Sequence, residues 1–118
     1  MSTTGTVISN RARAMLDDDG AAGSYRFKPT DILMWINDAT RLIWEKATES
    51  HYASDGSLNT YAELGALTEN IILDDEYREA IAHYVAALAL RRKSGEADNM
   101  ARLESHVVAF KNMTGVDV

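Results

Sequence analysis

The sequence contains no cysteine among its 118 residues, which excludes disulfide bonds and thiolate metal sites. A place of assembly inside a cell is therefore expected. No stretch approaches the roughly 20 apolar residues that a membrane-spanning helix needs. The first fifteen residues have neither a long apolar core nor a small-residue cleavage signature, so no secretory signal is expected. These absences predict a soluble protein that is made in a cytoplasm and has no membrane contact.

Positive charge is also scarce, because 12 Lys and Arg residues stand against 18 Asp and Glu residues and give a formal net charge of -6. A protein that coats nucleic acid generally needs a basic surface, so this class is disfavoured. An acidic surface is compatible with standing beside DNA without adhering to it. With 46% hydrophobic and 25% charged residues, the chain is expected to fold as one domain over residues 1–118.

Catalytic motifs are missing too. There is no phosphate-binding loop, no dinucleotide-binding glycine motif, no nucleophile elbow, and no serine patterned with a histidine and an acid. His51, His83 and His106 are far apart in sequence, although the last two could face each other across a helical hairpin. The acidic run at residues 17–19 lacks the ligand spacing of a calcium loop and predicts a solvated loop. We therefore predict no enzyme activity, no cofactor and no metal site.

What the chain does contain is helical patterning, most clearly in its C-terminal half. Residues 74–93 and 96–113 each carry apolar side chains at helical spacing, and the short break at Ser94 and Gly95 predicts an antiparallel hairpin. Asp74 or Asp75 is placed to begin the first of these helices, and Gly115 to end the second. The second helix is a poor candidate for reading DNA, because it has one Arg and several acids.

Two further helices are predicted nearer the N-terminus. The first covers residues 6–18 and places these apolar side chains on one side: Val7, Ile8, Ala12, Met15 and Leu16. The second covers residues 32–49, with Thr30 as N-cap and Asp31 near the positive end of its dipole. Trp35 and Trp44 are nine residues apart on it, so one of them is expected at a rim or interface, with both in the core as the alternative.

The predicted fold class is all-α, a small bundle of about four helices with an irregular, partly extended middle segment. Its predicted core consists of Ile36, Ile43, Tyr77, Ile81, Tyr84, Leu88, Leu103, Val107 and Phe110. The irregular segment is 51–73. Within it, Thr60 and Glu63 match a capping box that predicts one or two helical turns through Leu67. Residues 70–73 predict an extended segment packed on the bundle, with an edge that pairs with a neighbouring subunit as the alternative.

Three regions are candidates for contacts with other proteins. The cluster 91–93 complements the dipole of its helix, and it can also contact an acidic partner or a phosphate. The middle segment and the short C-terminal tail, residues 114–118, add apolar side chains. The candidate assembly contacts are Tyr61, Leu67, Ile71, Ile72, Leu73, Arg91, Arg92, Lys93, Met113, Val116 and Val118.

Three short motifs occur in order along the chain. Residues 35–39 read WINDA and fit a W-[IL]-N-[DE]-A pattern after an acidic loop and an aromatic approach. A D-x-Y-x-x-A-[IL]-x-x-Y-V-x-x-x-A pattern is fitted by Asp75, Tyr77, Ala80, Ile81, Tyr84, Val85 and Ala89. Phe110 and Gly115 fit an F-x-x-x-x-G ending. This order resembles the tailed-phage head-to-tail adaptor (connector) family over most of the chain. Residues 51–70 depart from it, since many members carry a longer, strand-bearing insertion there.

The resemblance implies a structural protein of the virion neck, present in the host cytoplasm during assembly. Such a protein forms a ring, commonly of twelve copies, on the portal at the capsid vertex. It extends the DNA channel and offers a platform to the next tail component. The implied partners are the portal protein, neighbouring copies, a tail or nozzle protein, and genomic DNA that passes through the lumen without sequence-specific binding. The alternative is a small cytoplasmic helical module that binds or regulates another protein.

Overall fold

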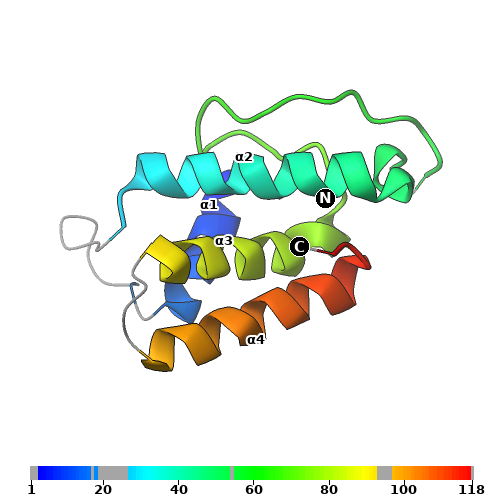
Figure 1. Ribbon diagram of the computed structural model, residues 1–118. Helices are drawn as coiled ribbons and strands as arrows, with labels where there is room; N and C mark the ends of the chain where they lie inside the picture. Colours follow the sequence, from blue (N-terminus) through cyan, green and yellow to red (C-terminus); the bar gives the residue numbers. More distant parts are fainter. Residues whose placement is uncertain (1–2, 17, 19–26, 54, 93–96, 118) are drawn as a thin grey trace.

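The helices are arranged around α3. The structure, a computed structural model, describes residues 3–16, 18, 27–53, 55–92 and 97–117. Its elements are α1 (Gly5–Met15), α2 (Pro29–Lys46), the 3-10 helices η2 (Thr48–His51) and η3 (Asp75–Tyr77), α3 (Arg78–Arg92) and α4 (Ala97–Thr114). α3 packs between α2 and α4, and α1 crosses behind it (Figure 1). The described residues contain no strand, so the predicted all-α bundle of about four helices is confirmed.

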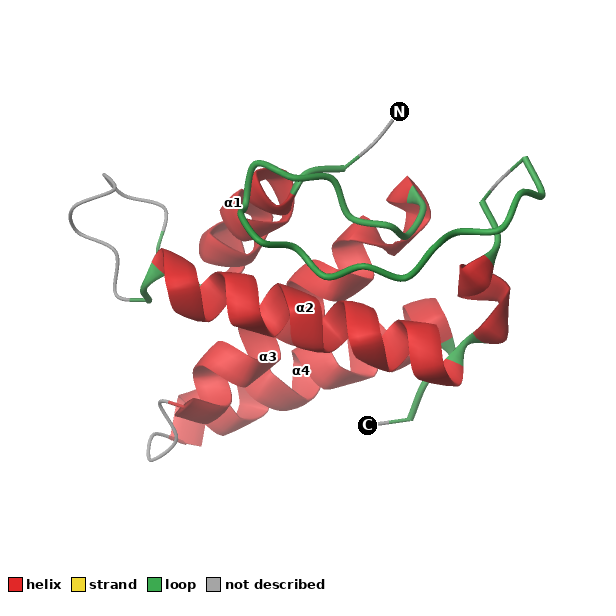
Figure 2. Cartoon of the chain, turned by 90° about the horizontal axis from the view of Figure 1, so that it is seen from above, coloured by secondary structure: helices red, strands yellow, loops and turns green. Residues whose placement is uncertain are grey.

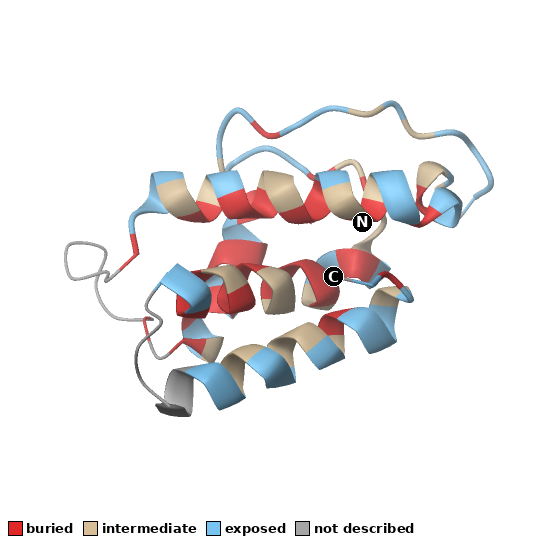
Figure 3. Ribbon diagram, in the orientation of Figure 1, coloured by how far each residue is buried: buried red, intermediate tan, exposed pale blue. Residues whose placement is uncertain are grey.

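Small side chains allow α3 to take this central place. Five alanines of α3 are buried, which lets neighbouring helices approach its backbone closely: Ala80, Ala82, Ala86, Ala87 and Ala89. Alanine is also the best helix former, so close packing costs no helical propensity. Ile81 and Val85 fill the remaining inward positions and are fully buried. α3 and α4 run antiparallel, as predicted, and α3 is buried over most of its length (Figure 3).

The predicted start of the second helix is wrong by a few residues. α2 begins at Pro29, with Lys28 in the N-cap position, so Thr30 lies inside the first turn and caps nothing. Proline suits this place because its fixed φ is already helical and its missing N–H has no partner in a first turn. α2 ends at Lys46 rather than at residue 49, and η2 follows it.

The apolar face of α2 is the one that its spacing predicts. Its buried side chains are Ile32, Trp35, Ile36, Ala39 and Ile43, and Ala47 follows just beyond the helix. On α1, Ile8, Ala12 and Leu16 are buried in steps of four residues, whereas Val7 is 44% exposed. Val7 was therefore assigned to the wrong side, since it lies about 100° around the helix from Ile8.

The predicted core residues fall into two groups. Five of them are buried: Ile36, Ile43, Tyr77, Ile81 and Phe110. The others are half-buried, and Tyr84, Leu88 and Leu103 pack against the core while Val107 lies at its margin. Trp35 is buried, and the half-buried Trp44 stacks on His51 with ring centroids 3.9 Å apart. One tryptophan therefore lies in the core and the other at its rim, as the first of the two alternatives predicted.

The middle segment returns over α2 to the start of the chain (Figure 2). Residues 60–67 are not helical, so the predicted capping box is wrong. The segment pairs instead with the residues before and at the start of α1. Ile71 N–H donates to the Thr3 carbonyl at 2.8 Å, and Thr6 N–H donates to the Leu67 carbonyl at 2.8 Å. Ile71 is buried, so the predicted packing of residues 70–73 on the bundle is confirmed.

An ion pair is buried where α1 gives way to the approach to α2. The side chains of Arg13 and Asp18 are 2% and 4% exposed, and Arg13 Nη1 lies 2.8 Å from Asp18 Oδ2. The same Arg13 nitrogen donates to the Phe27 carbonyl at 2.9 Å, and Phe27 N–H donates to Asp18 Oδ2 at 3.3 Å. The prediction of a solvated loop is therefore wrong for Asp18, which is buried. The rest of the predicted loop, residues 17 and 19–24, lies outside the described residues.

Candidate interaction surfaces

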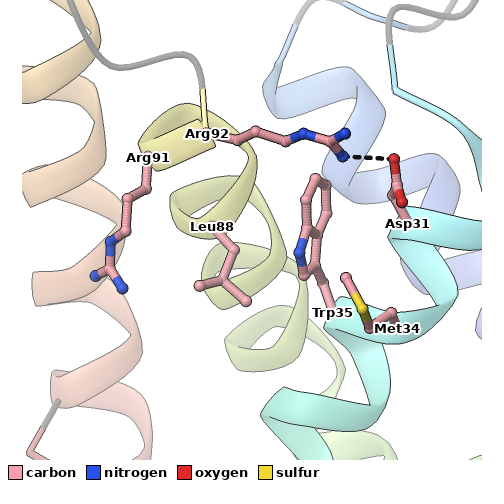
Figure 4. Close-up of a pocket in the computed structure, with 6 residues that line it drawn as sticks. All are labelled: Asp31, Met34, Trp35, Leu88, Arg91 and Arg92. Carbon is pink, nitrogen blue, oxygen red and sulfur yellow. Dashed lines mark hydrogen bonds and ion pairs between the residues drawn. The ribbon is translucent and has the colours of Figure 1, made fainter.

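A pocket of about 400 Å³ lies where the first turns of α2 meet the last turns of α3 (Figure 4). Its lining residues are Asp31, Met34, Trp35, Leu88, Arg91 and Arg92. We call this set the Trp35 pocket. The Phe27 ring contacts Trp35 in an edge-on arrangement, with centroids 6.1 Å apart. Met34 is exposed, so the pocket combines apolar surface with a cationic rim.

The two arginines of this rim differ in what they contact. Arg92 reaches across Trp35 to Asp31, with Nη1 2.5 Å from Oδ2 and its guanidinium carbon 5.9 Å from the ring centroid (Figure 4). Such exposed pairs contribute only about 0–1 kcal/mol, so this one orients Arg92 more than it stabilises the fold. Arg91 is exposed and has no ion pair among the described residues. Its charge is therefore available to a partner, whereas that of Arg92 is largely compensated.

The opposite end of the bundle has the opposite charge. A pocket of about 260 Å³ is lined there by Glu49, Glu76, Tyr77, Met113 and Thr114. We call this set the Met113 end, since Met113 is 51% exposed at its edge. The pKa of Tyr77 is raised first by burial and then by the nearby carboxylates of Glu76 and Glu49. Neither of these two glutamates has an ion pair among the described residues.

His83 and His106 do face each other across the α3–α4 hairpin. Their Nδ1 atoms are 2.8 Å apart, and their ring centroids are 5.1 Å apart. The centroid separation equals the nitrogen separation plus a ring radius at each end, so the two nitrogens point straight at each other. One nitrogen must then donate and the other accept. Burial lowers the pKa of both histidines, and Glu79 opposes this at His83.

This geometry is that of a hydrogen bond between neutral rings. In the part of the chain that the structure describes, no three His, Asp or Glu side chains are grouped so that they could hold a metal ion. Arg11 of α1 pairs with Glu79 at 2.9 Å, and Arg102 of α4 lies near His106, so cations as well as an acid surround the pair. The contact joins α3 to α4.

The outer surface of α2 holds the returning middle segment. The Asn37 amide nitrogen donates to the Leu64 carbonyl at 3.0 Å, and its oxygen accepts from Leu64 N–H at 2.8 Å. Arg41 Nη2 lies 2.5 Å from Glu63, which also accepts from the Tyr61 hydroxyl at 2.7 Å. Hydrogen bonds from Tyr61 and then from Arg41 lower the pKa of Glu63. The segment is thus tied down along its length although it forms no helix.

The predicted assembly contacts are distributed unevenly over the structure. Ile71, Leu73 and Val116 are buried inside their own chain, so they offer no surface to a neighbour in this conformation. Tyr61, Leu67 and Ile72 are half-buried along the middle segment, whereas Arg91, Arg92 and Met113 are exposed. Lys93 and Val118 lie outside the described residues. The sequence argument missed that Met34 and Trp35 share a pocket with Arg92, because the contact joins residues 57 positions apart.

The sequence was compared with known families and with characterised proteins. No family model matches the chain, and no curated protein is matched by it. Among the helices of the described residues, none combines the length and the apolarity that crossing a membrane would require.

Proposed function

We propose that this protein is a head-to-tail adaptor of a tailed phage. In this role it assembles as a ring on the portal, extends the DNA channel and gives the next tail component a docking platform. Twelve copies is the expected number. The proposal rests on the resemblance stated above, and three features of the molecule support it.

The residues that carry the resemblance are those that hold the helices together. This observation carries the proposal. Trp35, Ile36 and Ala39 of the WINDA motif are buried in the core, and Asn37 of the same motif fixes the returning segment through two hydrogen bonds. The motif positions of α3 and α4 are also inside or against the core: Tyr77, Ala80, Ile81, Tyr84, Val85, Ala89 and Phe110. The match therefore lies in the framework of the fold.

The distribution of apolar side chains also suits a subunit of a larger assembly. α4 packs mainly on α3, and its outer face leaves Met100, Val108 and Met113 about half exposed (Figure 3). Met34 and Leu58 are exposed on other elements. In a ring, each copy uses two different surfaces on its two neighbours, so apolar side chains on several faces are covered together.

Net charge is the third feature. A channel for DNA has to pass a polyanion without retaining it, and the chain carries a formal charge of -6. Contacts that neutralise phosphates would release counterions and hold the DNA in place. An acidic balance reduces such contacts. A fold alone does not determine a function, so the proposal depends on assembly and is tested there.

The test mixes the purified protein with the purified portal ring of the same phage. Native mass spectrometry is expected to show a complex heavier than the portal by about twelve chains, and electron cryomicroscopy a collar that continues the portal channel. The portal alone and the portal with an unrelated acidic helical protein are the controls. Mass spectrometry of purified virions is expected to detect the chain. Failure to bind the portal together with absence from virions would refute the proposal and favour the cytoplasmic binding module.

A further inference from the structure

We infer that neighbouring copies join head to tail, with the Met113 end of one copy seated in the Trp35 pocket of the next. That these contacts close into a ring rests on the proposed function. The contact itself is inferred from the apolar and charged side chains at the two ends of the bundle. These ends are far apart on the chain's surface, because the Trp35 pocket lies at the end of α3 and the Met113 end lies at its beginning (Figure 1).

The apolar parts of the two ends complement each other. The Trp35 pocket is hollow, about 400 Å³, and is lined with apolar surface from Trp35, Met34 and Leu88. Met113 is exposed on the other end. A methionine side chain is unbranched and flexible, and its sulfur makes favourable contacts with aromatic rings, so it adapts well to an aromatic pocket. Docking would cover Met34 and Met113, two of the exposed large apolar side chains.

The charges complement each other as well. Arg91 on the rim of the Trp35 pocket has no ion pair among the described residues, and the same holds for Glu49 and Glu76 beside Met113. Bringing the two ends together places these unpaired charges of opposite sign on facing rims. Rim charges of this kind guide association and fix its orientation more than they add affinity.

The charges also select the symmetry of the contact. Two Trp35 pockets facing each other would oppose arginine to arginine, and two Met113 ends would oppose glutamate to glutamate. Like charges placed together disfavour both of these two-fold arrangements. The remaining arrangement joins one end to the other, which is a heterologous contact that produces a closed ring when its rotation allows. Because one chain carries both complementary ends, the occupant of the pocket is a second copy of this chain.

Site-specific disulfide formation tests the contact, since the natural chain has no cysteine. The variant Met34→Cys/Met113→Cys is oxidised at high concentration, alone and with the portal ring, and is analysed by non-reducing gel electrophoresis. The two positions belong to opposite ends of a molecule 43 Å long, too far apart for a disulfide within one chain. A ladder of multimers is expected. Each single variant is expected to remain monomeric, because its cysteine faces a methionine of the neighbouring copy, and mixing the two single variants is expected to give the mixed dimer.

A matched control pairs Met34→Cys with Val108→Cys, because Val108 is as exposed as Met113 but stands five residues earlier on α4 and does not line the pocket of the Met113 end. No ladder is expected from this pair, and an equal ladder would overturn the inference. In the Met34→Cys/Met113→Cys background, Arg91→Glu and Glu76→Arg are each expected to abolish the ladder and together to restore it. Circular dichroism confirms that each variant is folded. A ladder indifferent to Arg91→Glu would count against the charge pairing and overturn the proposed contact.

The two proposals fail in different ways. A ring on the portal without a Met34–Met113 ladder would leave the adaptor function standing and show that the copies meet elsewhere. A ladder with rescue by the charge exchange, from a protein that neither binds the portal nor occurs in purified virions, would establish the contact and refute the adaptor function. Absence of both would refute both.

Discussion

Breaking the buried ion pair between Arg13 and Asp18 by replacing one partner should destabilise the protein at least as much as replacing both partners. The two side chains are almost fully buried and are joined at 2.8 Å. Removal of one partner deprives the other buried charge of this ion pair in a medium that solvates charge poorly, which costs about 3–5 kcal/mol. We expect Asp18→Leu and Arg13→Met each to lose this amount, a large part of the roughly 5–15 kcal/mol that stabilises a typical domain.

The double variant tests the cause of the loss. Replacing a buried ion pair by apolar side chains of similar size is often neutral or stabilising, by up to about 4 kcal/mol. Here that gain is offset, because the Phe27 N–H and carbonyl lose the side chains that they contact, at about 1–3 kcal/mol for each backbone group. Arg13→Met/Asp18→Leu should therefore be no less stable than either single variant, although two independent losses would total about 6–10 kcal/mol.

Urea unfolding followed by circular dichroism gives the required free energies. With a slope of about 2 kcal/mol per molar urea, each single variant should lower the midpoint by about 2 M. The slope should be equal in all four proteins, which serves as the control that the same transition is compared. Two outcomes would refute the reasoning: a single variant within about 1 kcal/mol of the wild type, or losses that simply add in the double variant.

Three further predictions concern other parts of the bundle. Phe110→Ala should cost about 3–5 kcal/mol in urea unfolding because the ring is fully buried, whereas Met100→Ala, on the exposed side of the same helix, should change stability by less than about 0.5 kcal/mol; equal losses would show that α4 is seated differently. Burial lowers the pKa of His83 and His106, so the unfolded chain binds more protons than the folded chain once the pH falls below their ordinary value of 6.5. Stability should therefore be full above that pH and fall on acidification, and replacement of both rings by glutamine should flatten this dependence; an unchanged dependence would contradict it. Asn37→Ala should cost about 1–2 kcal/mol and speed hydrogen exchange in the returning segment but not in α3; uniform acceleration would indicate global destabilisation instead.

Much of the fold is predictable because apolar spacing records which side of a helix faces inward. The buried face of α2 and the antiparallel α3–α4 hairpin follow from that spacing. Apolar spacing predicts the buried side chains least well in a helix that has neighbours on several sides, such as α3, or on one side only, such as α4. α3 buries side chains outside the predicted core, such as Ala82 and Leu90, and α4 leaves Met100 exposed although it shares the helical spacing of Phe110. Spacing gives the direction of a side chain, and the neighbouring helices decide whether that direction is covered.

The remaining differences come from contacts between distant residues. Thr60 and Glu63 have the spacing of a capping box, but Glu63 is bound by Arg41 and Tyr61, and Asn37 holds the next backbone unit. Asp18 belongs to an acidic run of a kind that is usually exposed to solvent, and its burial is possible because it pairs with the side chain of Arg13. Local pattern contains no information about such partners. The same limit applies to the Trp35 pocket, which forms only when α2 and the end of α3 are brought together.

The pairing of residues 3–6 with residues 67–71 has a consequence for biosynthesis. α1 is translated before the other helices of the bundle, yet Gly5 and Thr6 donate their backbone N–H groups to the carbonyls of Glu69 and Leu67, which are translated more than 60 residues later. At about 5–20 residues per second, a ribosome needs roughly 3–12 s to cover that distance. Through this interval α1 also lacks α3, the helix on which it mainly packs, so its apolar side, with Ile8 and Leu16, is not yet covered. Of the four helices, α1 thus waits longest for its native neighbours after its own synthesis, and chaperones have the greatest opportunity to bind there.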